Sequence, residues 1–118
     1  MSPKVYAYEK CGTCREAMKY LEARSIPHTL VPIREQPPTR AELKRVLATY
    51  AGDVRRLFNT SGLEYRRLKL RDKLPKMTGD EAVALLAGNG NLVKRPFVLS
   101  GSGGRAGFDE EEWKDLLK

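Results

Sequence analysis

Cys11-Gly12-Thr13-Cys14-Arg15 follows an apolar run over residues 5–8 and precedes a helix-forming run over residues 16–23. A strand, a tight turn and a helix that opens with Cys-x-x-Cys are typical of a redox centre or a thiolate nucleophile. At the helix mouth, free N–H groups and the positive end of the helix dipole favour a negative charge. We therefore predict that Cys11 ionises at neutral pH.

The two cysteines differ in their place on the predicted helix. Cys14 shares one apolar face with Ala17, Met18 and Leu21, at spacings of three and four, whereas Cys11 lies before that face. This predicts an exposed, attacking Cys11 and a more buried, resolving Cys14. Two alternatives stay open: Cys14 as a core residue only, and Arg15 as a residue that merely covers the helix surface.

The composition is that of one compact domain over residues 1–118, with 41% hydrophobic and 31% charged residues. No apolar run approaches the roughly 20 residues of a membrane span, and no secretory pattern opens the chain. We expect a cytoplasmic protein, where cysteines at this spacing favour catalysis or redox sensing over a permanent disulfide. A zinc site needs about four ligands, and His28 is the one other soft candidate, so no metal is expected.

The net charge of +7 suits an anionic substrate or an acidic partner. Much of the excess lies in residues 55–76, whose cationic side chains are Arg55, Arg56, Arg66, Arg67, Lys69, Arg71, Lys73 and Lys76. Such a run is typical of a solvated helix face. Direct nucleic-acid binding is disfavoured, because no basic motif interleaved with aromatic residues accompanies it.

The rest of the chain alternates strand and helix signals. Strands are predicted over residues 5–8, 28–33, 97–99 and 106–108, with Pro32 placing the second at an edge. Helices are predicted over residues 16–23, 39–49, 54–58, 63–70, 78–88 and 109–117, with Thr39–Glu42 and Thr78–Glu81 capping boxes. This order is the thioredoxin-like plan, an α/β fold with a mixed four-stranded sheet flanked by helices and a helical insertion over about residues 39–88.

Four segments, in this order along almost the whole chain, resemble the arsenate reductase-like (ArsC/Spx) family of thioredoxin-fold proteins. They are Cys11-Gly12-Thr13-Cys14-Arg15, Asn59-Thr60-Ser61-Gly62-Leu63-Glu64-Tyr65, Leu92-Val93-Lys94-Arg95-Pro96-Phe97-Val98-Leu99 and Gly107-Phe108-Asp109-Glu110-Glu111-Glu112-Trp113. One Cys-x-x-Cys is moderate evidence, whereas the four segments together are specific to the family.

The resemblance implies a role for each matched position. Cys11 corresponds to the nucleophile, with Arg15 beside it, and Arg95 to an anion-binding arginine before a cis proline, Pro96, that packs against the active cysteine. Arg105 is a looser match to a substrate arginine. The expected catalytic residues are Cys11, Cys14, Arg15 and Arg95, and the expected substrate-binding residues are Gly12, Thr13, Pro96 and Arg105.

Two positions depart from the family pattern. Ser61 stands where the family usually has an arginine, and Cys14 stands where glutaredoxin-dependent arsenate reductases commonly have serine. The resemblance implies a monomeric thiol-dependent reductase of a small oxyanion or disulfide, with no bound cofactor and with electrons from glutathione, glutaredoxin or thioredoxin. The alternative is a redox-switched regulator similar to Spx, which binds RNA polymerase, because Cys-x-x-Cys is typical of Spx.

Overall fold

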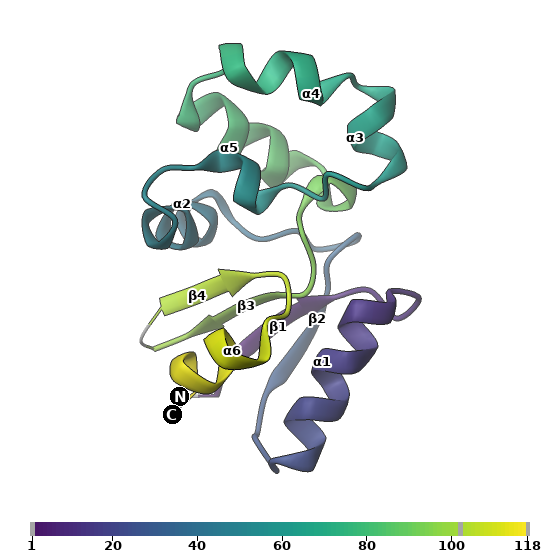
Figure 1. Cartoon of the computed structure of the whole chain (residues 1–118), viewed down its shortest axis with the longest axis vertical. Coiled ribbons are helices and arrows are strands. Elements are labelled where there is room, and N and C mark those ends of the chain that lie inside the picture. Colours follow the sequence, from purple (N-terminus) through teal and green to yellow (C-terminus); the bar gives the residue numbers. More distant parts are fainter. Residues whose placement is uncertain (1, 102, 118) are drawn as a thin grey trace.

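A four-stranded sheet organises the chain, whose computed structural model describes residues 2–101 and 103–117. The strands are β1 (Lys4–Ala7), β2 (Thr29–Pro32), β3 (Phe97–Ser100) and β4 (Gly103–Ala106), in the spatial order β2-β1-β3-β4. β2 runs parallel to β1, while β3 and β4 are antiparallel to their neighbours (Figure 1). The predicted mixed sheet is confirmed, and β2, which contains Pro32, is an edge strand as expected.

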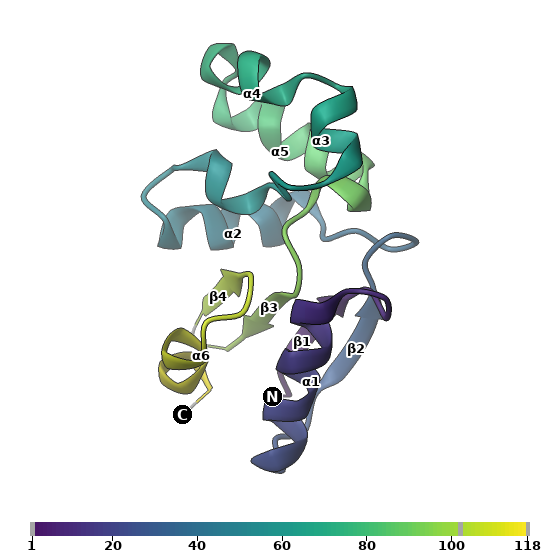
Figure 2. The ribbon, with the colours of Figure 1, turned by 45° about the vertical axis from the view of Figure 1, so that its right-hand side comes forward.

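Helices cover both faces of the sheet. α1 (Gly12–Ala23) and α6 (Glu110–Leu116) pack on one face against Val5, Ala7 and Val98. The segment between β2 and β3 covers the other face and contains α2 (Arg40–Thr49), η1 (Val54–Leu57), α3 (Leu63–Arg67), α4 (Leu70–Lys73), η2 (Leu74–Lys76), α5 (Gly79–Gly88) and η3 (Gly90–Leu92). Figures 1 and 2 show this segment gathered at one end of the molecule. The arrangement is thioredoxin-like, as predicted.

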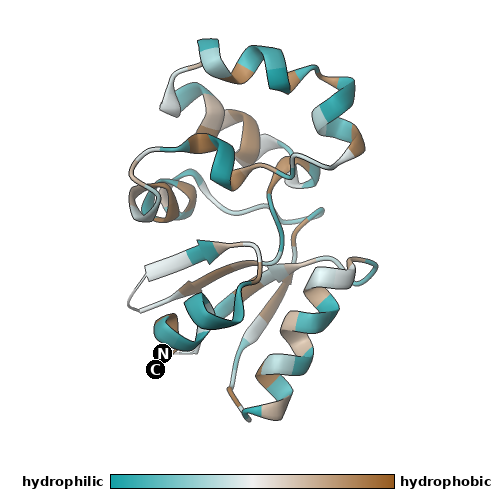
Figure 3. Cartoon of the chain, viewed as in Figure 1, coloured by the Kyte–Doolittle hydropathy of each residue, from teal (hydrophilic) through white to brown (hydrophobic). Residues whose placement is uncertain are grey.

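Alternation along the strands divides the core into two layers. Neighbouring strand residues point to opposite faces, so Tyr6, Phe97 and Leu99 join the core under α2 and α5. Figure 3 shows the apolar colouring along β3 and on α5 that marks these buried positions. Both capping boxes form, with the Thr39 and Thr78 side chains accepting from the amides of Glu42 and Glu81. Among the described residues, no helix is long and apolar enough to cross a membrane.

The predicted helix over residues 63–70 is wrong, because the structure breaks it into α3 and α4. Lys69 between them adopts the left-handed conformation, with φ +55°. Tyr65 and Leu70 are both buried, although positions five apart on one helix lie about 140° apart around its axis. The break lets both side chains reach the same core.

Smaller errors concern element ends. The last strand, predicted over residues 106–108, is β4 at Gly103–Ala106, because Gly107 leaves the strand at φ +87°. Ser102, in the turn expected before it, lies outside the described residues. α5 includes Gly88, the predicted C-cap, and Asn89 caps it instead. β1, at Lys4–Ala7, begins and ends one residue earlier than predicted, and β2, at Thr29–Pro32, is shorter than predicted.

Candidate active site

Cys11 is the N-cap residue of α1, at the helix mouth predicted for it. Its amide donates to the carbonyl of Tyr8 at 3.0 Å, and its sulfur accepts from the amide of Cys14 at 3.4 Å. Cys11 is half-buried, less exposed than expected, whereas Cys14 is buried, with 2% of its surface exposed. Both thiols are free. The sulfur of Cys11 thus receives a backbone donor from the first turn of the helix.

Two of the quoted segments pair beside Cys11. Phe58 and Val93 form an isolated antiparallel bridge. On either side of it, the amide of Asn59 donates to Leu92 at 2.7 Å and the amide of Lys94 donates to Leu57 at 2.8 Å. This short ladder places the residues that follow Asn59 next to Arg95.

Gly107 connects the third segment with the last. Its amide donates to the carbonyl of Pro96 at 2.8 Å, and its carbonyl accepts from the Trp113 indole at 3.0 Å. The Arg95–Pro96 peptide bond is cis, as expected. A Cβ on Gly107 would lie 2.8 Å from Cε of Lys94, so the Lys94 side chain passes directly over this glycine. The four segments therefore meet around one place.

That place is a pocket of about 460 Å³ with a cationic wall. Its described lining includes Lys10, Lys94 and Arg95 but no carboxylate. The full set is Tyr8, Lys10, Cys11, Thr13, Phe58, Asn59, Thr60, Ser61, Lys94, Arg95, Gly107 and Phe108. A pocket with this lining attracts an anion to the sulfur of Cys11.

The electrostatics separate the two thiols. Partial burial acts to raise the pKa of Cys11, but hydrogen bonds from Cys14 and the positive charge of Arg95 outweigh it, so the pKa is lowered. Burial raises the pKa of Cys14 to about 12, and the neighbouring Cys11 sulfur adds to the rise. Because the thiolate is the nucleophilic form, these pKa directions favour Cys11 over Cys14 as the attacking thiol.

Arg95 is a cation of this pocket that acts on the Cys11 sulfur. Its guanidinium carbon lies 5.1 Å from the centre of the Tyr8 ring, and the guanidinium contributes to the lowered pKa of Cys11. Its Nη1 atom is buried and has no hydrogen-bond partner. A buried donor without a partner costs free energy unless a ligand satisfies it, so Arg95 is suited to receive an oxyanion.

The other expected site residues are placed less closely. Thr13 lines the Cys11 pocket, and Gly12 is exposed next to it in the first turn of α1. Pro96 is buried behind Arg95. Arg105 forms an ion pair with Glu112 at 3.6 Å and donates to the Gly104 carbonyl. It is not among the lining residues of the Cys11 pocket.

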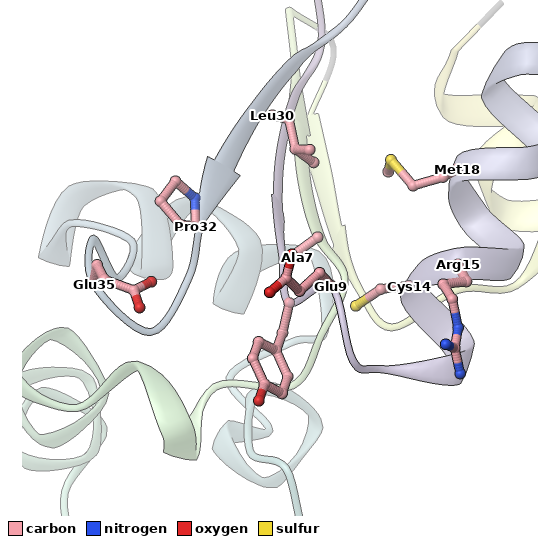
Figure 4. A pocket seen from close by; sticks show the side chains of 9 residues that line it. Ala7, Glu9, Cys14, Arg15, Met18, Leu30, Pro32 and Glu35 are labelled. Atoms are coloured by element: carbon pink, nitrogen blue, oxygen red, sulfur yellow. The ribbon is translucent and has the colours of Figure 1, made fainter.

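A second pocket, of about 560 Å³, lies on the Cys14 side, between α1 and the β1–β2 edge. Cys14, Met18 and Leu30 line it, and Arg15 stands at its border. Figure 4 shows Cys14 directed into this pocket, while the Arg15 guanidinium points away from Cys14. The structure therefore brings Cys11 and Arg95 together and leaves Arg15, an exposed residue, on the other pocket.

Sequence reasoning missed several pocket residues, and only some of them carried a signal. Lys10 and Lys94 each precede an expected site residue, so their adjacency to Cys11 and Arg95 was a usable clue. Tyr8, the last residue of the apolar run before the cysteines, carried no such clue, yet it contacts Arg95. Phe108 reaches the pocket only through the fold of the β4–α6 connection. Among the described residues, no group of His, Cys, Asp and Glu is arranged to hold a metal ion.

Comparisons with known proteins agree on one family. The model of the ArsC family matches residues 6–116. The uncharacterized protein YusI of Bacillus subtilis is 43% identical over 98% of both chains. An arsenate reductase of Rhizobium meliloti is 29% identical over 99% of this chain and 82% of its own. The crystal structure of an ArsC family related protein from Bacteroides fragilis, also 43% identical, matches with a TM-score of 0.92 over 98% of both chains. Regulators named Spx are more distant relatives, such as Spx 1 of Lactococcus lactis, 24% identical over 96% of this chain and 87% of its own.

Proposed function

The chain belongs to the ArsC family, and from that premise we propose that it is a thiol-dependent reductase whose nucleophile is Cys11. The observation that carries the proposal is the pairing of Cys11, whose pKa is lowered, with a buried and unpartnered Nη1 of Arg95 in a pocket whose described lining has no carboxylate. The substrate is an anion, either a small oxyanion or an anionic disulfide such as a glutathione adduct.

With a disulfide substrate, the Cys11 thiolate attacks one sulfur and the S–S bond breaks. The leaving thiolate takes a proton from water, and Cys11 is left in a mixed disulfide. With an oxyanion such as arsenate, the sulfur bonds to the central atom and hydroxide leaves as water after protonation. A second thiol then attacks the Cys11 sulfur and forms a disulfide. The bond between that sulfur and the central atom breaks, and its electron pair stays on the central atom, which is thereby reduced by two electrons.

The second thiol is Cys14 or an external glutathione. Cys14 starts as a poor nucleophile, because burial raises its pKa to about 12. Once Cys11 is in an adduct its negative charge is gone, so one cause of the raised Cys14 pKa disappears while burial remains. We propose that glutathione, glutaredoxin or thioredoxin returns the enzyme to the dithiol state, with no bound cofactor, in a cytoplasmic monomer.

Steady-state turnover and a single-turnover reaction distinguish the roles of Cys11, Cys14 and glutathione. The substrate, arsenate or glutathionylated peptide, is supplied with NADPH and either the glutathione–glutaredoxin or the thioredoxin system. We expect Cys11→Ser to abolish the NADPH consumption that wild type adds to the background of the coupling system alone. In a single turnover with glutathione disulfide, wild type should form a Cys11–Cys14 disulfide, whereas Cys14→Ser should accumulate Cys11 joined to glutathione, as measured by intact mass.

The outcomes are distinct. Turnover that persists in Cys11→Ser contradicts the proposal, as does a glutathione adduct on Cys14 in wild type. Equal turnover by wild type and Cys14→Ser assigns resolution to glutathione. Activity with the peptide but none with arsenate would identify disulfides as the substrates.

A second candidate function is redox-dependent regulation through RNA polymerase, as in Spx. The observation in its favour is the Cys-x-x-Cys itself, in which the Cys14 amide lies 3.4 Å from the Cys11 sulfur and both thiols are free. Formation of a Cys11–Cys14 disulfide would then alter a binding surface, with the basic segment from Arg55 to Lys76 as part of it. Affinity capture with RNA polymerase in both redox states tests this, and no binding in either state contradicts it.

A further inference from the structure

Tyr8 stands between the two cysteine pockets. It follows β1, is half-buried, and lines both the Cys11 pocket and the Cys14 pocket. Its carbonyl accepts from the amide of Cys11 at 3.0 Å. The backbone of Tyr8 is therefore fixed to the start of the Cys-x-x-Cys turn, which also fixes the origin of its side chain.

The ring of Tyr8 has two cationic partners. The guanidinium carbon of Arg95 lies 5.1 Å from the ring centre, and that of Arg34, from the loop after β2, lies 4.8 Å away. A cation is attracted to an aromatic face by the ring quadrupole, and this attraction occupies none of the N–H donors of the guanidinium. A carboxylate in the same place would take up those donors and neutralise the charge.

The surroundings of Arg95 are those of a guanidinium that contacts a ring and not a carboxylate. No carboxylate is among the described residues that line the Cys11 pocket, and Nη1 of Arg95 is buried without a partner. An arginine side chain has many rotamers, and holding it in one of them costs entropy. Contact with a large, half-buried ring lowers that cost while the guanidinium keeps its charge.

We propose that Tyr8 is a positioning residue, whose ring holds the Arg95 guanidinium beside Cys11 and leaves its Nη1 donor free for an anion. The role of Tyr8 in anion capture rests on the proposed function. Its role beside Cys11 does not, because the guanidinium acts on the Cys11 sulfur of the resting protein, before any substrate binds. A test on the resting protein therefore distinguishes failure of this inference from failure of the reductase assignment.

The test compares Tyr8→Leu, which removes the aromatic face, with Tyr8→Phe, which keeps it. The readout is the pKa of Cys11, from the pH dependence of its alkylation rate by iodoacetamide, in a Cys14→Ser background. We expect Tyr8→Leu to raise this pKa by about half a unit, which is about a threefold loss of thiolate below the midpoint, and Tyr8→Phe to retain the wild-type value.

Two further measurements separate positioning from general packing. In an Arg95→Gln background, Tyr8→Leu should no longer change the pKa of Cys11, because the residue it acts through is gone. Pentafluorophenylalanine at position 8 keeps the shape of the ring but removes the attraction of its face for a cation. This variant should show the rise in the pKa of Cys11 that is expected of Tyr8→Leu, and it provides the test if the leucine variant does not fold. An unchanged pKa in the fluorinated protein, or an equal shift in the Arg95→Gln background, would overturn the proposal.

Discussion

Arg95→Gln is expected to lower turnover of an anionic substrate by about 10²- to 10³-fold, the usual cost of removing one donor aimed at developing charge. Two effects combine. The charge that helps to lower the pKa of Cys11 is lost, so less thiolate is present at neutral pH. The buried donor of Nη1 that would meet the substrate is also lost.

Matched variants make this prediction specific. Arg95→Lys keeps the charge but not the planar fork, so it should recover part of the thiolate but little of the turnover. Arg15→Gln and Arg105→Gln remove equal charges, from an exposed residue outside the Cys11 pocket and from an arginine paired with Glu112. Both should retain nearly full activity in the same steady-state assay. A large loss of turnover in Arg15→Gln, together with normal turnover in Arg95→Gln, would contradict our assignment of Arg95 as the anion-binding arginine.

Gly90→Ala is expected to lower the free energy of unfolding by about 3 kcal/mol, the upper end of the usual cost of overpacking, as measured by urea denaturation. A Cβ at this position would lie 1.9 Å from the carbonyl oxygen of Ile33 and 3.1 Å from Cα of Arg34. Both contacts are with backbone, so no side-chain rotation relieves them. η3 must move away from the end of β2, and with it the chain that leads to Arg95.

Gly88→Ala is the matched control, two residues earlier. A Cβ there meets nothing within 4 Å, and Gly88 is the last residue of α5. Alanine in a helix is more favourable than glycine by about 0.5 to 1 kcal/mol, so this variant should be slightly stabilised. Equal stability of the two variants would contradict the close approach of η3 to the end of β2.

Local sequence signals predicted the parts of this fold that depend on neighbouring residues. The helix mouth at Cys11 and both capping boxes involve residues three or four apart, and the structure confirms them. The β2 edge followed from a proline that cannot donate to a sheet. These features can be predicted from the sequence because the residues that form them lie within about one turn of the chain.

Features that depend on distant contacts were not predicted. The break at Lys69 arises because Tyr65 and Leu70 must reach one core. The contact of Tyr8 with Arg95 joins positions 87 residues apart (95 − 8), and no local pattern encodes it. Arg15 shows the converse, since its proximity in sequence to Cys11 suggested a contact, yet Arg15 lies at the border of the other pocket with its guanidinium pointing away from Cys14.

The measurement that tests the central claim most directly is the alkylation rate of each cysteine as a function of pH. Samples of wild type are treated with iodoacetamide from about pH 5 to about pH 10, and peptide mass spectrometry quantifies Cys11 and Cys14 separately. Our account predicts that Cys11 reacts with a midpoint below the free-thiol value of about 8.5, and that Cys14, whose pKa is raised to about 12, stays unreactive across the range. Equal, slow rates for both thiols, with midpoints at or above the free-thiol value, would contradict it.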